Sequence, residues 1–254
     1  MDSAINFQVN SNRIIDNTRK GLSLLFIFIY QMVAAQPTLI QTLGLDDSHL
    51  VKLEGNQLTP KTAAAFCAMQ TAALQDGIDL QLVSAYRSFE RQQYIWEDKY
   101  KRYTSEGMTP KDAIDRILQY STIPGTSRHH WGTDIDITDN NAPKQKRVLV
   151  PEKFHNNGPF APLRKWMEEN ASKFGFYLVY TNDTTRTGFS YEPWHYSYLP
   201  EAKHYQQQYD SRTAFAYFKS VGAYGSAYID IDFWQAYYSL FIKGINVELT
   251  LPSF

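Results

Sequence analysis

The stretch Ser127–Asp136, SRHHWGTDID, holds side chains of the types that bind divalent metals. Six residues separate His129 from Asp136, and an imidazole and a carboxylate both suit zinc. A catalytic zinc site takes three protein ligands and keeps one position open. His195, in YEPWHYSY, is the natural third ligand, and Glu192 is placed to accept a proton from water. Spacing alone equally allows polar surface residues, so both interpretations stay open at this point.

Three segments resemble the ordered motifs of one enzyme family. SRHHWGTDID has the S-x-H-x6-D pattern of the VanY-type zinc D-alanyl-D-alanine carboxypeptidases, and EPWHYSY has their E-x-W-H pattern. SAYRS, at Ser84–Ser88, resembles their upstream S-x-Y-R-S segment, and the matches run in the family's order from Gln81 to Tyr198. The resemblance implies the fold shared by hedgehog proteins and D-Ala-D-Ala peptidases, a small antiparallel sheet flanked by helices. It also implies hydrolysis of the terminal D-alanine peptide bond of peptidoglycan stem peptides.

The resemblance assigns roles to individual residues. It implies one Zn²⁺ held by His129, Asp136 and His195, with Glu192 as the catalytic base. Arg87 matches the arginine that binds the substrate and stabilises the scissile carbonyl as it becomes an oxyanion. Positioned charge of this kind is usually the largest contribution to acyl-transfer catalysis.

Residues beside the motifs allow alternative interpretations. Ser127 matches a substrate-contacting residue or only shapes the loop, and Trp194, which we expect to contact substrate, equally fits core packing. His130 is expected beside the ligands or facing the substrate, because adjacent side chains of an extended backbone diverge. Trp131 either lines the site or packs in the core. Asp134 either orients a ligand histidine or is solvated.

Charge and cysteine content exclude some classes of protein. The chain has 254 residues, with 25 Lys and Arg against 26 Asp and Glu, and no long basic run. Its net charge of −1 therefore gives no indication of a nucleic-acid partner. Cys67 is the only cysteine, so no internal disulfide can form, and the pattern KTAAAFCAMQTAAL predicts that it is buried.

The first 35 residues have the features of an export segment. Arg13, Arg19 and Lys20 precede the apolar run Gly21–Ala35, which is shorter than the roughly 20 residues of a membrane-spanning helix. We therefore expect residues 1–35 to be a signal peptide or an N-terminal anchor, with a buried helix as the alternative. The expected location is the periplasm or the cell envelope, with no membrane partner beyond such an anchor.

Hydrophobic patterning predicts an α+β domain over residues 36–200. Thr-Pro starts and 3.6-residue periodicity predict helices at 59–77, 88–103, 109–121 and 160–175. Alternation predicts strands at 79–88, 133–138, 176–180 and 191–199. In the second of these, Ile135 and Ile137 should lie on one face and Asp134 and Asp136 on the other. The irregular order of elements favours a small antiparallel or mixed sheet.

Residues 201–254 differ in composition, being rich in Tyr and Phe with few charges. We expect a C-terminal extension of helices and strands packed on the domain, because aromatic stripes usually belong to a core. An aromatic surface that binds glycan is the alternative.

Two rival functions are compatible with the same residues. An L,D-carboxypeptidase or a peptidoglycan endopeptidase would use the same zinc chemistry on another bond. A non-catalytic zinc or cell-wall-binding module would need neither Glu192 nor Arg87. In each case the expected partner is the peptidoglycan stem peptide, and the sequence leaves the oligomeric state open.

Overall fold

The computed structural model describes residues 36–144 and 146–250. The predicted signal peptide or anchor, residues 1–35, lies outside the described residues. No helix within the described ranges is long and apolar enough to cross a membrane. The predicted boundaries of the peptidase domain and of the C-terminal extension stay predictions.

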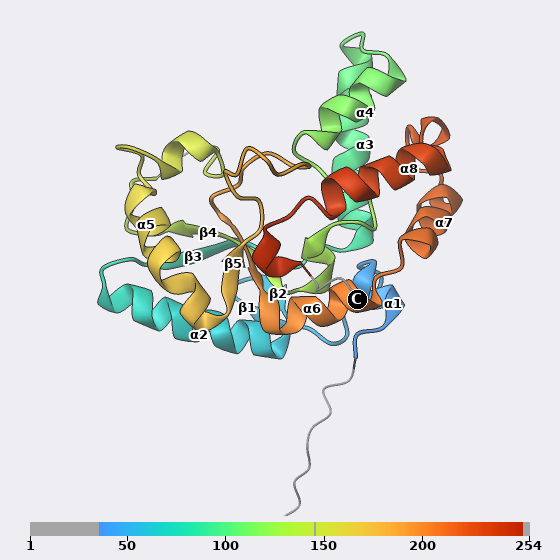
Figure 1. Ribbon diagram of the computed structural model, residues 1–254. Helices are drawn as coiled ribbons and strands as arrows, with labels where there is room; N and C mark the ends of the chain where they lie inside the picture. The colour runs from blue at the N-terminus through green and yellow to red at the C-terminus, as the bar shows by residue number, and fades with distance from the viewer. Residues whose placement is uncertain (1–35, 145, 251–254) are drawn as a thin grey trace, which may run out of the picture. The chain divides into compact units, whose positions relative to one another are not determined.

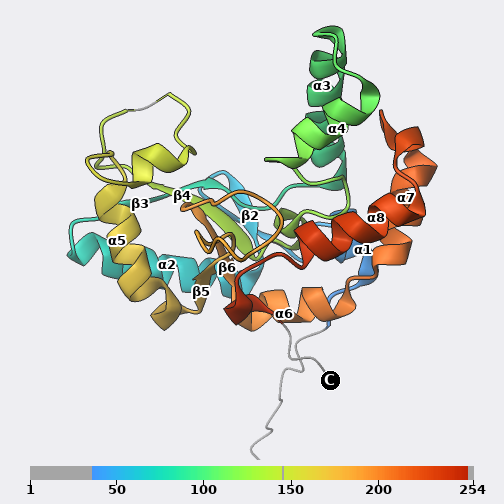
Figure 2. The same cartoon turned by 45° about the horizontal axis from the view of Figure 1, so that its top comes forward.

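The central element is a four-stranded antiparallel sheet with the strand order β3-β4-β6-β5 (Figures 1 and 2; β6 is labelled in Figure 2). Its strands are β3 (Leu80–Ser84), β4 (Asp134–Asp139), β5 (Phe176–Leu178) and β6 (His195–Tyr198). A separate hairpin of β1 (Val51–Leu53) and β2 (Asn56–Leu58) was not predicted. The helices are α1 (Leu39–Thr42), α2 (Pro60–Gln75), α3 (Phe89–Ser105), α4 (Pro110–Leu118), α5 (Ala161–Asn170), α6 (Leu199–Gln208), α7 (Ser211–Val221) and α8 (Ile231–Tyr237). The predicted α+β class with a small antiparallel sheet is therefore confirmed.

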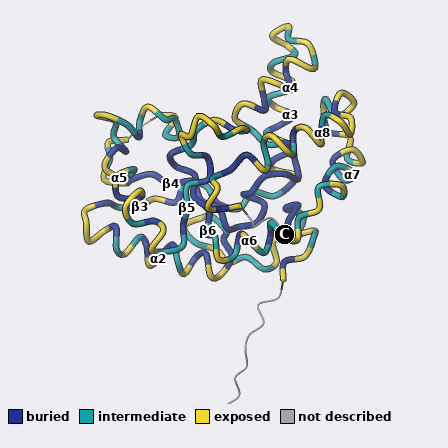
Figure 3. Tube along the Cα trace, viewed as in Figure 1, coloured by how far each residue is buried: buried dark blue, intermediate teal, exposed yellow. Residues whose placement is uncertain are grey.

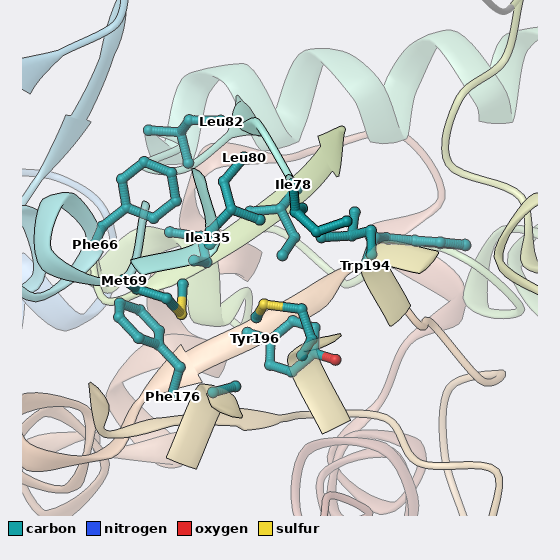
Figure 4. Packing of buried hydrophobic residues seen from close by; sticks show 14 of the residues in the cluster. Phe66, Met69, Ile78, Leu80, Leu82, Ile135, Phe176, Trp194 and Tyr196 are labelled. Carbon is teal, nitrogen blue, oxygen red and sulfur yellow. The ribbon is translucent and has the colours of Figure 1, made fainter. Parts of the chain in front are cut away.

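Side-chain alternation gives the sheet one apolar face and one polar face. Ile135 of β4 and Tyr196 of β6 join a core that also contains Phe66 and Met69 of α2 (Figure 4). Between these positions, the polar side chains of β4 and β6 point to the opposite face. Every residue of β4 is buried, so both faces of this strand are covered (Figure 3). The polar face of β4 therefore lies inside the protein, where its charges need partners.

Local capping explains where three helices begin. Thr59, Ser88 and Thr109 are the N-caps of α2, α3 and α4, and each side chain accepts a backbone N–H of the first turn. Proline follows the cap in α2 and α4, where its missing N–H would in any case have no intrahelical partner. The predicted starts of these helices are confirmed.

Three predicted strands are shorter than their sequence patterns, and the one expected at 79–88 covers only Leu80–Ser84. The strand expected at 176–180 ends at Leu178, and the strand expected at 191–199 begins only at His195. The Glu-Pro-Trp segment before His195 forms a turn instead, in which His195 N donates to the carbonyl of Glu192 at 3.1 Å. Pro193 has no N–H to offer a neighbouring strand, so pairing starts after it.

The C-terminal segment is helical rather than mixed. Residues 199–250 contain α6, α7, α8 and a π-helical turn, and within this described segment no strand occurs. In both views α7 and α8 lie beside α3 and α4 (Figures 1 and 2). Together they form a second buried cluster, which includes Trp96, Ile114, Phe218, Trp234 and Tyr237. The expectation of strands in this segment is therefore wrong within its described part.

Cys67 is exposed, so the prediction that it is buried is wrong. The buried side of α2 is formed by Phe66, Met69 and Ala73, and Cys67 is rotated about 100° away from Phe66.

We expect the native protein to react with one equivalent of an aromatic disulfide reagent, because the Cys67 thiol is accessible. Absorbance of the released thiolate measures the reaction, and Cys67→Ser is the control that should abolish it. Reaction only after denaturant is added would contradict the exposed position.

Candidate metal and catalytic site

Three potential metal ligands meet on the polar face of the sheet. His129 lies in the short 3-10 helix Arg128–Trp131, Asp136 in β4 and His195 in β6. The register of β4 and β6 places Asp136 directly opposite His195. One ligand atom from each of these buried residues lies within 4.8 Å of the others, so the group could hold a metal ion.

Backbone contacts orient His129. Its Nδ1 lies 2.8 Å from the carbonyl oxygen of Ala85, which leaves Nε2 3.5 Å from Asp136 Oδ2. The helix that carries His129 ends at Gly132, whose φ of 68° favours glycine. A Cβ at this position would lie 2.6 Å from Leu50 Cδ2. The tight turn at Gly132 thus brings the histidine beside the strand that carries Asp136.

His195 is held through both ring nitrogens. Nε2 lies 2.9 Å from Asp134 Oδ2, and Nδ1 lies 3.0 Å from Glu192 Oε2. Burial lowers the pKa of His195, but these two hydrogen bonds outweigh it and raise the pKa to about 10. The two carboxylates therefore favour positive charge on the His195 ring.

Asp134 is the centre of a buried polar network. It is fully buried and accepts hydrogen bonds from Arg128 Nε at 2.9 Å and from Ser197 Oγ at 2.6 Å. Burial raises the pKa of Asp134, but Arg128 and the His195 hydrogen bond outweigh it, so the pKa lies below its usual value. Of the two interpretations, the solvated one is wrong, and the contact with His195 is the one observed.

The surroundings of Asp136 show that the site suits a cation. Burial raises the pKa of Asp136, yet His129 and other positive groups hold it below its usual value, so the carboxyl is ionised. Its Oδ1 is buried and has no hydrogen-bond partner among the described residues. A buried ionised oxygen without a partner is costly, and a cation beside it would remove that cost. Two imidazoles and a carboxylate are also the donor types that zinc takes.

Glu192 lies at the edge of this group. Its backbone N–H donates to the Tyr180 carbonyl at 3.1 Å, which fixes the turn before β6. The side chain is 16% exposed and lines a cavity of about 500 Å³, together with the metal-ligand group. Glu192 is therefore more exposed than His129, Asp136 and His195, which line the same cavity.

Arg87 reaches the same cavity from the end of β3. Its backbone N–H donates to the His129 carbonyl at 3.0 Å, and Nη1 donates to Gln92 Oε1 at 3.0 Å. Burial lowers its pKa, while the nearby carboxylates Asp136 and Glu192 act in the opposite direction. The structure thus brings one guanidinium and one accessible carboxylate to the same cavity as the metal-ligand group.

Several further segments of the chain line the cavity. Ser127, Arg128 and Trp194 belong to the motif segments, and Tyr180 and Phe189 form an aromatic pair. The other lining residues are Tyr120, Ser121, Thr122, Leu149, Val150, Pro151 and Glu152.

Comparison with known proteins identifies the family. Residues 55–201 match the sequence model of VanY, D-alanyl-D-alanine carboxypeptidase. The chain belongs to the VanY family. The match covers both motif segments and Arg87, so the resemblance seen in the sequence is confirmed.

Individual members of the VanY family cover only part of this chain. A D-alanyl-D-alanine carboxypeptidase of Enterococcus faecalis is 34% identical over 129 residues, 50% of this chain and 43% of that protein. One from Enterococcus faecium is 29% identical over 163 residues, 63% of this chain and 42% of that protein. The chain thus spans less than half the length of these two relatives. Among solved structures, VanYB in complex with D-alanine-D-alanine is 28% identical with a TM-score of 0.48, covering 67% of this chain and 87% of that chain.

Two residues inside the first VanY motif do not line the cavity. His130 is fully buried; its Nδ1 lies 2.6 Å from the Arg87 carbonyl and its Nε2 accepts from Gly125 N at 3.1 Å. Burial lowers the pKa of His130 to about 3, so it is neutral. Trp131 packs on Tyr205 and donates to the Thr42 carbonyl. The substrate-facing position of His130 and the site-lining position of Trp131 are therefore wrong.

The sequence reasoning missed Arg128 and Gln92. Arg128 is buried and ion-paired with Asp134, and Gln92 links Arg87 to the Thr122 carbonyl. In the sequence, Arg128 was marked only by its position as a charged residue inside a VanY motif. No sequence pattern indicated a role for Gln92. Both act through partners distant in the chain, which spacing alone does not reveal.

Asp134→Asn is expected to lower the free energy of unfolding by about 3–5 kcal/mol, because it leaves the buried Arg128 charge without its partner. The loss should be complete at neutral pH. The stability difference should shrink as the pH falls below about 3.9, the pKa of an aspartate in the unfolded chain. The reason is that Asp134 has a lower pKa in the folded protein, so protonation costs the folded state its stabilising charge. Urea denaturation in the presence of a chelator measures the difference without any contribution from metal binding.

The matched control is Asp115→Asn, at an exposed position of α4. Its effect should lie within about 0.5 kcal/mol, as for other exposed substitutions. Equal effects of the two substitutions would contradict the importance of the buried Asp134 network.

Proposed function

We propose that this member of the VanY family is a zinc-dependent carboxypeptidase that removes the terminal D-alanine of peptidoglycan stem peptides. The observation that carries the proposal is the convergence of the His/Asp/His group, Glu192 and Arg87 on one cavity. A metal-binding group alone would fit a structural site, but an accessible carboxylate and a guanidinium beside it fit hydrolysis.

One zinc ion would be held by His129 Nε2, Asp136 and His195 Nδ1. The orphaned Asp136 Oδ1 and the contacts that orient both imidazoles support this choice. A related solved structure, a mutant of the vancomycin-resistance D,D-pentapeptidase VanY, is described in complex with Zn(II). When bound, zinc supplies a Lewis acid that lowers the pKa of water and polarises a carbonyl.

Glu192 is proposed as the general base. Its carboxylate borders both the metal-ligand group and the cavity, so it can accept the proton of the attacking water. After the carbon–nitrogen bond breaks, the same carboxyl returns this proton to the departing amine of D-alanine. One group acting first as base and then as acid balances the protons of the hydrolysis.

Arg87 is proposed to stabilise the negative charge that develops on the scissile carbonyl oxygen. The hydrogen bond to Gln92 holds its guanidinium before the substrate arrives, so little reorganisation is needed during the reaction. Ser127 and Trp194 are proposed to contact the substrate, because both line the cavity. Residues 1–35 would deliver the enzyme to the periplasm or cell envelope, where its substrate lies.

The L,D-carboxypeptidases and endopeptidases remain the rival activities, since the proposed chemistry is the same for each bond. A non-catalytic binding module is disfavoured, because it would need neither Glu192 nor Arg87 at the cavity. Incubation with defined muropeptides, followed by mass spectrometry, tests the proposal. We expect pentapeptides to lose one D-alanine. Conversion of tetrapeptides to tripeptides or cleavage of cross-links would instead support a rival, and no turnover with zinc bound would overturn the enzymatic proposal.

Glu192→Ala is expected to keep zinc and to lower kcat by about 10²–10⁴-fold, because general-base catalysis contributes about that factor. Elemental analysis measures the bound zinc, and D-alanine release from a pentapeptide measures kcat. A zinc-loaded variant with normal kcat would contradict the assignment of Glu192 as the general base.

Two further variants make this experiment specific. His195→Ala should lose the zinc itself, because it removes one of the three proposed ligands. Glu169→Gln, at an exposed position of α5, should change neither zinc content nor kcat. Unchanged zinc in His195→Ala would count against its role as a ligand.

A further inference from the structure

The segment that follows the VanY match contacts the cavity walls. The match ends at residue 201, and α8 lies beyond it. Tyr237, the last residue of α8, is 2% exposed and belongs to the cluster shared with α3 and α4. Its hydroxyl contacts the loop Tyr120–Ser127, whose Ile123 belongs to the same cluster and which immediately precedes the helix that carries His129.

The Tyr237 hydroxyl makes two buried hydrogen bonds to this loop. Its oxygen accepts from the backbone N–H of Ile123 at 3.1 Å. It also lies 2.7 Å from Thr126 Oγ1. The Thr126 hydroxyl donates its hydrogen to the Ile123 carbonyl at 2.7 Å, so Tyr237 is the donor to Thr126. Both hydrogen-bonding roles of the hydroxyl are thus used within one tight loop.

The residues on either side of these contacts line the cavity. Ser121 and Thr122 precede Ile123, and Ser127 follows Thr126. The loop is held at three other points, by Lys99 at the Ser121 hydroxyl, by Gln92 at the Thr122 carbonyl and by His130 at the Gly125 N–H. Gln92 and His130 lie inside the VanY match, whereas the Tyr237 contact comes from outside it.

The same C-terminal segment also contacts a second segment that lines the cavity. Asn246 N donates to the Val179 carbonyl at 2.9 Å, next to the cavity residue Tyr180. Arg186 Nη1 donates to the Gly244 carbonyl at 2.9 Å, and its Nη2 donates to the carbonyl of Phe189 at 2.7 Å. Two separate segments that line the cavity are therefore hydrogen-bonded, directly or through neighbouring residues, to residues 237–246.

We propose that the C-terminal segment is a functional part of the active site, in which Tyr237 is a positioning residue for the substrate-binding loop Tyr120–Ser127. The inference rests on the proposed carboxypeptidase function. Neither hydrogen bond of Tyr237 goes to a lining residue, so its hydroxyl acts through the loop. Loss of its hydroxyl should weaken substrate binding while leaving the metal-ligand group, which is held by other contacts, intact.

Tyr237→Phe tests this proposal, because it removes the hydroxyl and keeps the buried ring. We expect KM for a D-Ala-D-Ala pentapeptide to rise about fivefold or more, the ratio that corresponds to one net hydrogen bond. Zinc content and kcat should stay close to those of the unsubstituted enzyme. In hydrogen–deuterium exchange, the peptide covering residues 120–128 should exchange faster, since the Ile123 N–H loses its acceptor.

Tyr238→Phe is the matched control. Tyr238 adjoins Tyr237 and stacks on Tyr209, away from the loop, so KM and exchange at 120–128 should not change. Thr126→Val removes the partner hydroxyl, and its combination with Tyr237→Phe should raise KM less than the product of the two single effects.

Unchanged KM together with unchanged exchange in Tyr237→Phe would overturn the proposal. So would loss of zinc or an equal fall in kcat, because either would mean that Tyr237 supports the whole site rather than the loop. Failure of the proposed function is distinguishable: the unsubstituted enzyme would then release no D-alanine. The exchange of residues 120–128 would still report the positioning contact.

Discussion

The antiparallel pairing of β4 with β6 is the constraint on which the site depends. Its register sets Asp136 opposite His195 and Asp134 opposite Ser197. Because side chains alternate along each strand, all four polar residues lie on the same face of the sheet, and the intervening apolar residues join the core with α2. A shift of one residue in this pairing would exchange the two faces and place the carboxylates in the hydrophobic core. The apolar core therefore enforces the register that the metal-ligand group requires.

Because this polar face is buried, its charged groups need hydrogen bonds or partners of opposite charge. Asp134 is satisfied within the protein by Arg128, His195 and Ser197, and this network holds the His195 ring in one orientation. Asp136 is left with a buried oxygen that has no partner among the described residues. The Asp134 carboxylate thus binds only protein groups, whereas Asp136, which lines the cavity, keeps an oxygen free for a cation. This division between two acids two residues apart separates a supporting residue from a proposed metal ligand.

The cavity is built from parts of the chain that are far apart in sequence. Its floor comes from β4, β6 and the short helix that carries His129, and its walls come from loops after α4 and after β5. Loops have no internal ladder of hydrogen bonds to hold them, so neighbouring elements must do so. Here α3 supplies Gln92, and the helical C-terminal segment supplies Tyr237 and Asn246. The second hydrophobic cluster joins α3 and α4 to α7 and α8, and it includes Tyr237 and its loop partner Ile123.

The sequence by itself determined the features that depend on near neighbours. Thr59 and Thr109 cap their helices as predicted, and the alternation around Ile135 predicted its strand, because both signals act within a few residues. The VanY motifs likewise indicated the residues that meet at the cavity. Only the tertiary structure decided that Arg128 is the buried partner of Asp134 and that Cys67 is exposed. The limits of β5 and β6 were also decided by pairing with neighbouring strands. Burial and pairing depend on which distant segments pack together, and no local periodicity carries that information.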